Sequence, residues 1–469
     1  MNQLSLAWRN ILRNRRRSAL TLAAVCVAAI AILLLGGYVR ATVRALETDT
    51  VRQTGHLQVM TQGYLQFGRG NPGRFAIREH EAVAAALRAD TALQAMVTVI
   101  TPVLHVQGVA GHFASGTSSN FAGSGWDPDA RSLMLEWNGN ALRMPPGAVY
   151  LSAQQPSAGV IGLGLAQLLG LCEALEAKDC VSVPRATPDP SAPALSDELT
   201  RLTQQSATPA SATVGVASAP AAPAIELLSA GAGGAPNVVR MEVLRAQRQG
   251  ARELDAMYVG VPLALAQRLV FGPGGSGASA IAIQLKRSAD LEPARARVNA
   301  VLATLPQALE VHDFHLIAPN FDQVVALFTA VFRFVSVLMA VVTLFSVANT
   351  INMAVGERTG EIGTLRALGM KRRPVRSMFL IEGAMLGAVG AGLGALLGIV
   401  LGEYVINSSG MSWTPPGRAT PVPVGVDVLG DPVFMAGAVA FFAVLACVSS
   451  WWPARRAARL EIVEALRHV

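Results

Sequence analysis

Four long apolar windows constrain the fold of this chain more than any other feature of its sequence. Each window lacks charged residues and is about 18 or more residues long, which is the length that an α-helix needs to cross the ~30 Å hydrocarbon core of a bilayer. Hydrophobic residues make up 52% of the chain and charged residues 15%, so we expect an integral membrane protein. The windows are Ser18 to Val39, Phe334 to Gly356, Gly383 to Gly402 and Pro432 to Ala454.

The basic residues beside these windows predict the orientation of the chain in the membrane. Lys and Arg gather before the first window, between the second and third, and after the fourth, whereas the 403–431 loop contains only Arg418. Because cytoplasmic loops carry an excess of Lys and Arg, these three basic segments are predicted to be cytoplasmic. The first window is longer than the apolar part of a signal peptide and lacks a small-x-small cleavage signal, so it is expected to remain as an anchor.

The windows and the basic segments together predict nine consecutive segments. They are a cytoplasmic N-terminal segment at 1–17, a first transmembrane helix at 18–39, an extracytoplasmic domain at 40–325, a second transmembrane helix at 326–356, a cytoplasmic helix and loop at 357–377, a third transmembrane helix at 378–402, an extracytoplasmic loop at 403–431, a fourth transmembrane helix at 432–454 and a cytoplasmic tail at 455–469.

The long segment between the first two spans is predicted to be an α+β domain. Alternating apolar residues indicate strands in "GHLQVM" (55–60) and in residues 95–110, and helical patterns occur at 78–90 and 290–305. From 184 to 236 the composition changes to Ala, Ser, Pro, Thr and Gly, which bury too little surface to offset the entropy of ordering. We expect a flexible insertion there, between a helical piece at 162–171 and strand-like residues at 237–246.

The signatures of several enzyme classes are missing. The net charge of +7 comes from arginines beside apolar windows and not from the aromatic-laced basic patches of nucleic-acid-binding proteins. The phosphate-binding loop of a Walker ATPase needs a lysine directly after a glycine. The chain has three lysines, and none of them follows a glycine: Lys178, Lys286 and Lys371. The sequence shows no G-x-S-x-G elbow with a histidine partner. We therefore predict no catalytic residues and no enzymatic activity in this chain.

The four cysteines specify little about the fold. Cys26 and Cys447 fall within predicted spans, where a small apolar role is expected. Cys172 and Cys180 are eight positions apart in the predicted external domain, where a disulfide can form. The sequence does not decide between a disulfide and two free thiols for this pair. No Cys/His cluster has the spacing of a metal site, so no metal ligands are predicted.

The segment from Val355 to Arg373 is a compact charged stretch between two apolar windows. Its residues favour a helix in which apolar side chains recur every three positions, with Gly369 as a stop. One interpretation is a solvated loop whose charges only set the topology. The other is a helix whose apolar stripe docks on a protein. The stripe consists of Ile362, Leu365 and Leu368.

The third window contains glycines that mostly recur every four residues: Gly383, Gly387, Gly390, Gly394, Gly398 and Gly402. This G-x-x-x-G spacing predicts close helix packing, either within the chain or across a dimer. Glu382 begins the span, and its carboxylate is expected either to have a function or to reach the membrane surface.

Three segments carry a resemblance to a known family. They are "NTINMAVGERTGEIGTLRALGMKRRPVRSMFLIEGAMLGAVGAGLGALLGIVLG", "PARRAARLEIVEALRH" and "LAWRNILRNRRRSALT". The chain resembles the permease domain of the FtsX-like and MacB-like ABC transporters, a family that includes the lipoprotein-releasing LolC and LolE subunits. The order of one span, a large external domain and three spans fits this family, whereas the 184–236 insertion departs from it.

The resemblance implies a permease without an active site of its own. The segment Glu357 to Gly369 would be a coupling helix docked in a groove of a separate cytoplasmic ATPase, and that ATPase would bind ATP and Mg. The implied contact residues are Glu357, Glu361, Ile362, Leu365, Arg366 and Gly369. A second permease chain, identical or different, would complete the complex in a bacterial inner membrane. A periplasmic or lipoprotein partner and membrane lipids are further expected partners, and nucleic acid is not.

Two functions follow from the resemblance. In the first, the ATPase drives motions of the periplasmic domain through the spans, a process called mechanotransmission, and a lipoprotein or another amphiphile is exported or released. The spans contain few polar groups, which argues against a hydrophilic path through the bilayer. In the second, an FtsX-type permease activates a periplasmic cell-wall hydrolase without moving a substrate.

Overall fold

The computed structural model describes residues 15–113, 115–142, 151–177, 180–182, 222–232, 234–414 and 421–460. They divide into unit 1, mainly residues 15–50, 318–413 and 421–460, and unit 2, mainly residues 51–317. Most of the predicted cytoplasmic N-terminal segment (1–17) and most of the predicted flexible insertion (184–236) lie outside the described residues.

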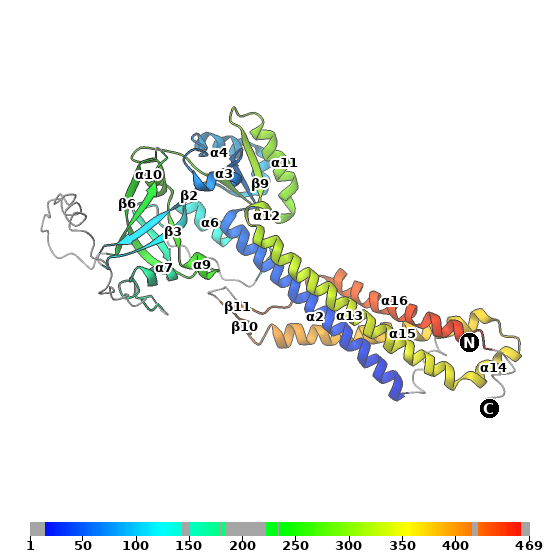
Figure 1. Cartoon of the computed structure of the whole chain (residues 1–469). Helices are drawn as coiled ribbons and strands as arrows, with labels where there is room; N and C mark the ends of the chain where they lie inside the picture. The colour runs from blue at the N-terminus through cyan, green and yellow to red at the C-terminus, as the bar shows by residue number, and fades with distance from the viewer. Residues whose placement is uncertain are drawn as a thin grey trace. The chain divides into compact units, whose positions relative to one another are not determined.

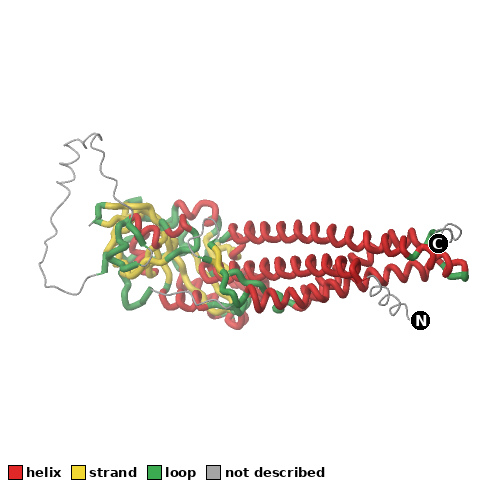
Figure 2. Tube along the Cα trace, turned by 90° about the horizontal axis from the view of Figure 1, so that it is seen from below, coloured by secondary structure: helices red, strands yellow, loops and turns green. Residues whose placement is uncertain are grey.

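Unit 1 is built from four long helices, and Figures 1 and 2 show that they run side by side. Each is long and apolar enough to cross a membrane, as predicted. A π-helical segment, η3 (Val400–Ile406), continues the third one. A short hairpin of β10 (Ser412–Trp413) and β11 (Val422–Pro423) follows. The four helices are α2 (Arg15–Thr54), α13 (Pro319–Glu357), α15 (Arg372–Ile399) and α16 (Pro432–Ala457).

Two of these helices extend well beyond the predicted spans. The sequence predicts that the first span ends at Val39, but α2 continues to Thr54. Apolar windows report hydrophobicity only, and residues 40–54 contain helix formers and no glycine or proline that would stop the helix. Helix α13 begins at Pro319 and not at position 326, because the fixed φ angle of a proline suits the first turn of a helix.

The glycines of α15 bring this helix into close contact with two neighbours in unit 1. A Cβ atom on Gly387 would lie only 2.6 Å from the Cβ atom of Ala446 in α16. A Cβ atom on Gly394 would lie 2.7 Å from the Cβ atom of Ala29 in α2. The glycine stripe therefore splits between two helices of the same chain. Gly383 belongs with the α16 contact, and Gly390 and Gly398 belong with the α2 contact.

Unit 2 contains a nine-stranded sheet in the order β3-β7-β4-β6-β5-β2-β8-β1-β9. The strands are β1 (Leu57–Thr61), β2 (Val97–His112), β3 (Thr117–Trp126), β4 (Ala158–Gly162), β5 (Ala224–Ala230), β6 (Pro236–Gln247), β7 (Tyr258–Pro262), β8 (Ala280–Leu285) and β9 (Leu309–Asp313). The helices are α3 (Tyr64–Phe67), α4 (His80–Ala89), α5 (Thr91–Met96), α6 (Pro128–Glu136), α7 (Leu163–Leu168), α9 (Arg252–Asp255), α10 (Leu263–Phe271), α11 (Leu291–Leu302) and α12 (Phe314–Ile317).

The long strand β2 belongs to two parts of this sheet. Its first half pairs with β8, from Val97↔Leu285 to Val103↔Ala280. Its second half pairs with β3 and, through Val109↔Leu228, with β5. Each of the remaining neighbours is also hydrogen-bonded, in the order β3-β7-β4-β6-β5. The second half of β2 contacts both ends of this series and therefore closes a six-stranded barrel.

Each part of the sheet has its own apolar core. The barrel interior is filled by buried side chains of its strands and of α7 and α10, among them Leu165, Met241 and Leu269. The open part, β2-β8-β1-β9, is covered by α4, α5 and α11, with Leu87, Leu93 and Val298 in the second core.

Two details of unit 2 concern the predicted insertion and the cysteines. The predicted flexible insertion ends too late at 236, because Ala224–Ala230 forms β5. Ile225 and Leu227 alternate with more exposed residues and are buried against the barrel core.

Cys172 and Cys180, whose bridging the sequence does not decide, are joined by a disulfide in the structure.

Candidate coupling site

A short helix, α14 (Thr359–Ala367), links α13 and α15 at one end of unit 1. We call this end of the bundle the α14 end. Gly369 has a φ angle of +94°, in the left-handed region that favours glycine. Its N–H donates to the carbonyl oxygen of Arg366 at 3.0 Å, and the N–H of Met370 donates to that of Leu365 at 3.1 Å. These two bonds form a Schellman motif, which ends α14 and reverses the chain into α15.

The predicted apolar stripe does not face one side of α14. Ile362 is 1% exposed and packs in the core of unit 1, whereas Leu365 is 37% and Leu368 80% exposed. At 3.6 residues per turn, Ile362 and Leu368 point about 120° apart. Ile362 is therefore not available as a docking contact, and the prediction for this residue is corrected. Glu361 and the two leucines lie on the exposed side of the helix.

A buried ion pair holds the start of α14 against α15. Nη1 of Arg358, the residue that precedes α14, lies 3.4 Å from Oε2 of Glu382, and the two side chains are 2% and 6% exposed. The carboxylate of Glu382 is therefore buried within unit 1 and paired with Arg358. A buried charge without its partner is strongly unfavourable, so this pair keeps the helices in register.

Two further contacts tie α14 to other parts of unit 1. The guanidinium of Arg17 in α2 pairs with the carboxylate of Glu357, the last residue of α13. The guanidinium of Arg366 donates to the carbonyl oxygen of Leu460, just beyond α16. The predicted site residues Glu357 and Arg366 thus connect elements within the bundle, and Gly369 shapes the turn that follows α14.

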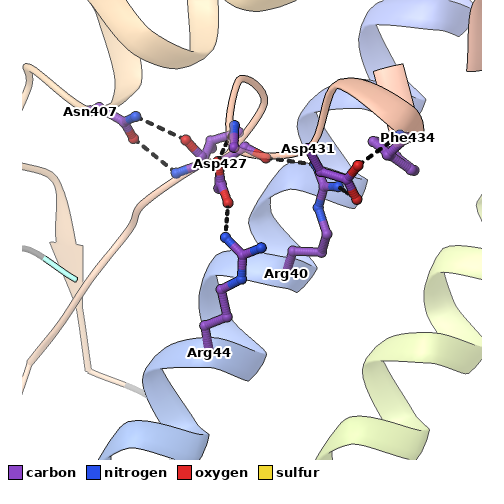
Figure 3. Close-up of polar contacts among 8 residues, drawn as sticks. Arg40, Arg44, Asn407, Asp427, Asp431 and Phe434 are labelled. Carbon is purple, nitrogen blue, oxygen red and sulfur yellow. Dashed lines mark hydrogen bonds and ion pairs between the residues drawn. The ribbon is translucent and has the colours of Figure 1, made fainter. Parts of the chain in front are cut away.

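At the opposite end of unit 1, two arginines of α2 hold the loop that precedes α16 (Figure 3). Arg40 donates through Nη1 to Oδ2 of Asp431 at 2.6 Å and through Nη2 to the carbonyl oxygen of Asp427 at 2.8 Å. The guanidinium of Arg44 pairs with the carboxylate of Asp427. The N–H of Phe434 and the nearby Arg40 keep the pKa of Asp431 below its usual range. We call Arg40, Arg44, Asp427 and Asp431 the loop clamp.

An asparagine fixes the other side of the same loop. The amide of Asn407 donates to the carbonyl oxygen of Val426 at 2.9 Å and accepts from its N–H at 2.8 Å (Figure 3). The sequence analysis predicted neither the loop clamp nor the two hydrogen bonds between Asn407 and Val426. A signal was present, because Arg40 and Arg44 share the spacing of four residues with Asp427 and Asp431.

Within unit 2, side chains bind the carbonyl groups at the C-terminal end of α2. Arg131 donates to the carbonyl oxygen of Arg52 at 2.8 Å, and Gln58 to that of Thr54 at 2.7 Å. Gln284 donates to the carbonyl oxygen of Val51 at 3.3 Å. The last carbonyl groups of a helix have no partner within it. Here the carbonyl groups of Val51, Arg52 and Thr54, which themselves belong to unit 2, accept hydrogen bonds from side chains of the same unit.

His56 lies next to this helix end and is fully buried. Its Nδ1 atom accepts from the N–H of Leu285 at 3.0 Å, and its Nε2 atom lies 3.2 Å from the hydroxyl of Ser288. Burial lowers the pKa of His56 to about 4. The ring also packs edge-on against Trp137, with 5.0 Å between the ring centroids. In the described part of the chain, no group of three or more His, Cys, Asp or Glu side chains has the geometry of a metal site.

The family model of the FtsX-like permease C-terminal domain matches residues 333–462. This segment runs from α13 through α14 and α15 to the end of α16. Residues 333–462 belong to the FtsX-like permease family. The match covers the α14 end and the Arg358–Glu382 pair, and it includes neither α2 nor unit 2.

Several ABC transporter permeases are similar to this chain over part of their length. LolC of Haemophilus influenzae, a lipoprotein-releasing system transmembrane protein, is 28% identical over 170 residues, or 36% of this chain and 42% of LolC. The macrolide export protein MacB of Bordetella avium is 25% identical over 229 residues, or 48% of this chain and 32% of MacB. An uncharacterized permease of Methanocaldococcus jannaschii is 24% identical over 202 residues, or 40% of this chain and 45% of that protein. The chain thus spans less than half the length of each of these relatives.

Proposed function

We propose that this FtsX-like permease is the membrane subunit of an ABC transporter and couples ATP hydrolysis in a separate ATPase to movements of unit 2. In this proposal the α14 end lies in the cytoplasm, unit 2 lies in the periplasm, and the four long helices cross the inner membrane. ATP and Mg bind to the ATPase chains, and a second permease chain completes the complex. The chain itself performs no catalytic step.

The exposed apolar side of α14 carries this proposal. Leu365 and Leu368 are 37% and 80% exposed at the tip of a short helix, together with Met370 at 38%. An exposed apolar cluster with charged neighbours is typical of a protein docking surface. Because α14 is anchored by the Arg358–Glu382 pair, a force on this cluster is passed to α15 and not absorbed by a loose loop.

The path from α14 toward unit 2 runs through α2. The Arg17–Glu357 pair connects the end of α13 to the first described turn of α2. Helix α2 is a single helix from Arg15 to Thr54, and its last carbonyl groups are held by side chains of unit 2. In this proposal, a displacement at the α14 end is passed to α2 through the Arg17–Glu357 pair. This route along the residues of the chain is the mechanotransmission that we propose.

The substrate class in this proposal is a lipoprotein or another amphiphile. LolC is named for lipoprotein release and MacB for macrolide export. The long helices of unit 1 expose many apolar side chains and offer few polar groups for a hydrophilic path. Handling of the substrate from the outer leaflet or from the periplasm fits these helices better than a water-filled channel.

The variant Leu365→Asp tests the docking surface. The purified permease is reconstituted with its ATPase in nanodiscs, and the stimulation of ATP hydrolysis by the permease is measured. A buried carboxylate at the interface would be costly to desolvate, so we expect the stimulation to fall at least tenfold while membrane insertion stays intact. Leu254→Asp is the matched control, because Leu254 in α9 of unit 2 is 53% exposed. Unchanged stimulation by Leu365→Asp would refute the docking surface.

A second measurement separates transport from regulation. Vesicles that carry a lipid-anchored reporter protein are incubated with the reconstituted complex and ATP, and release of the reporter is followed. Release that depends on ATP supports the amphiphile substrate. Full ATPase stimulation without release, together with activation of an added cell-wall hydrolase, would favour the FtsX-type regulatory function instead.

A further inference from the structure

A pocket with both polar and apolar lining residues lies between α2 and α13 near the α14 end of unit 1. Its volume is about 400 Å³, within the range of small-molecule sites. The polar residues that line it come from both helices: Arg16, Arg17, Thr21, Ser346, Asn349 and Thr350. We call these six residues the headgroup pocket. Both helices are candidate membrane spans, so the pocket opens between two helices that face lipid.

The charge of the pocket is positive. Arg16 and Arg17 line it, and no Asp or Glu is among the described residues that line it. Arg17 uses its Nη2 atom for the pair with Glu357, but its Nη1 atom is buried and has no hydrogen-bond partner among the described residues. A buried donor without a partner is unfavourable. An anionic oxygen atom would satisfy it.

Uncharged donors complete the lining. The hydroxyl groups of Thr21 and Thr350 are hydrogen-bonded to each other and so join the two helices. Ser346 and Asn349 add a hydroxyl and an amide on the α13 side. Arginine, hydroxyl and amide groups together are the donors that bind phosphate oxygens.

Two apolar residues on the same pocket distinguish a lipid from a free ion. Leu20 in α2 is 74% exposed and Met353 in α13 is 50% exposed, and both contribute to the lining. A free phosphate would gain nothing from these side chains. The acyl chains of a phospholipid would cover them while the phosphate group reached the arginines.

We propose that the headgroup pocket binds the phosphate group of an anionic phospholipid from the leaflet at the α14 end, with the acyl chains against Leu20 and Met353. Basic pockets between transmembrane helices hold such headgroups by charge and hydrogen bonds. Because Arg17 also pairs with Glu357, the bound lipid shares this guanidinium with the residue that ends α13. The lipid would thereby stiffen the joint between α2 and α13.

The test measures lipid binding to the purified full-length chain by native mass spectrometry. Dioleoyl-phosphatidylglycerol is titrated into the detergent solution, and dioleoyl-phosphatidylcholine serves as the zwitterionic comparison. We expect a preference for phosphatidylglycerol that falls about tenfold in the double variant Arg16→Gln/Arg17→Gln, because charge-assisted hydrogen bonds are lost. The matched control is Arg455→Gln/Arg456→Gln, which removes two exposed arginines in the last turn of α16. It should shift the affinity less than twofold.

A second variant separates a built site from general charge attraction. Asn349→Leu keeps every charge but removes an amide donor from the pocket, and we expect it to weaken phosphatidylglycerol binding several-fold. Millimolar inorganic phosphate should not displace the lipid, since it lacks the apolar contacts. Equal binding of both lipids, equal effects of the two arginine double variants, or displacement by inorganic phosphate would each overturn the proposal.

Discussion

The Nη1 atom of Arg358 lies 3.4 Å from the Oε2 atom of Glu382, and both side chains are almost fully buried in unit 1. The pair joins the residue before α14 to the middle of α15. Because its two members are 24 positions apart and only Glu382 lies within a helix, the pair attaches the start of α14 to α15.

We predict that removing one member of this pair harms the protein more than removing both. Glu382→Gln leaves the buried guanidinium of Arg358 without its counter-charge, and a broken buried pair costs about 3–5 kcal/mol. The double variant Arg358→Met/Glu382→Met replaces both charges by apolar groups and should retain most of the stability. The melting temperature of the detergent-solubilised chain, followed by size-exclusion chromatography after heating, measures this. Equal losses in the single and double variants would show that the pair is not coupled.

The loop clamp should behave as a network of modest strength. Arg44 and Asp427 are 38% and 23% exposed, and partly exposed pairs contribute about 0–1 kcal/mol each. We expect Asp427→Asn to lose the charge pair with Arg44. A double-mutant cycle with Arg44→Gln should give a coupling energy of about 1 kcal/mol. Hydrogen–deuterium exchange of residues 424–431 is the measurement, and strictly additive effects of the two single variants would contradict the pairing.

The stability of unit 2 around His56 should depend on pH. Its pKa is about 4 in the folded chain and about 6.5 when exposed. Between these values the unfolded chain binds a proton that the folded chain does not, so the free energy of unfolding is full above about pH 6.5 and falls as the pH drops toward 4. The loss approaches about 3 kcal/mol. A proton on Nδ1 would also face the N–H of Leu285.

The measurement for His56 is the free energy of opening of β8 by hydrogen exchange, corrected for the intrinsic pH dependence of exchange. The variant His56→Asn keeps an acceptor for the N–H of Leu285 but does not titrate. It should therefore remove the slope between pH 6.5 and 4. A slope that survives in His56→Asn would assign the pH dependence to another group.

The α15 glycines offer a prediction with a control in the same helix. Gly387→Leu places atoms where a Cβ would already lie 2.6 Å from Ala446, so α15 and α16 must separate. Overpacking of this kind costs about 1–3 kcal/mol. A Cβ on Gly392 meets nothing within 4 Å, and Gly392→Leu should change stability by less than about 0.5 kcal/mol. Thermal stability in detergent measures both variants, and equal effects would contradict the assigned packing faces.

The four membrane helices could be predicted from the sequence because hydrophobicity and length are local properties. The end of α14 at Gly369 could also be predicted, since a left-handed residue after a helix favours glycine whatever surrounds it. The strand-like and helical stretches of unit 2 followed from short-range alternation in the same way. The secondary structure of these elements is therefore determined mainly by residues that are close to one another along the chain.

Only the tertiary structure decided which groups meet. Ile362 is buried and Leu368 is exposed because unit 1 packs against one side of α14, which spacing alone does not reveal. Arg40 and Asp431 are 391 positions apart, and the second half of β2 leaves its first sheet to close a barrel. Such contacts depend on helix directions and strand pairing over long separations. The sequence by itself determined the apolar helices, and the packing of those helices determined which side chains hold α14 and which remain exposed.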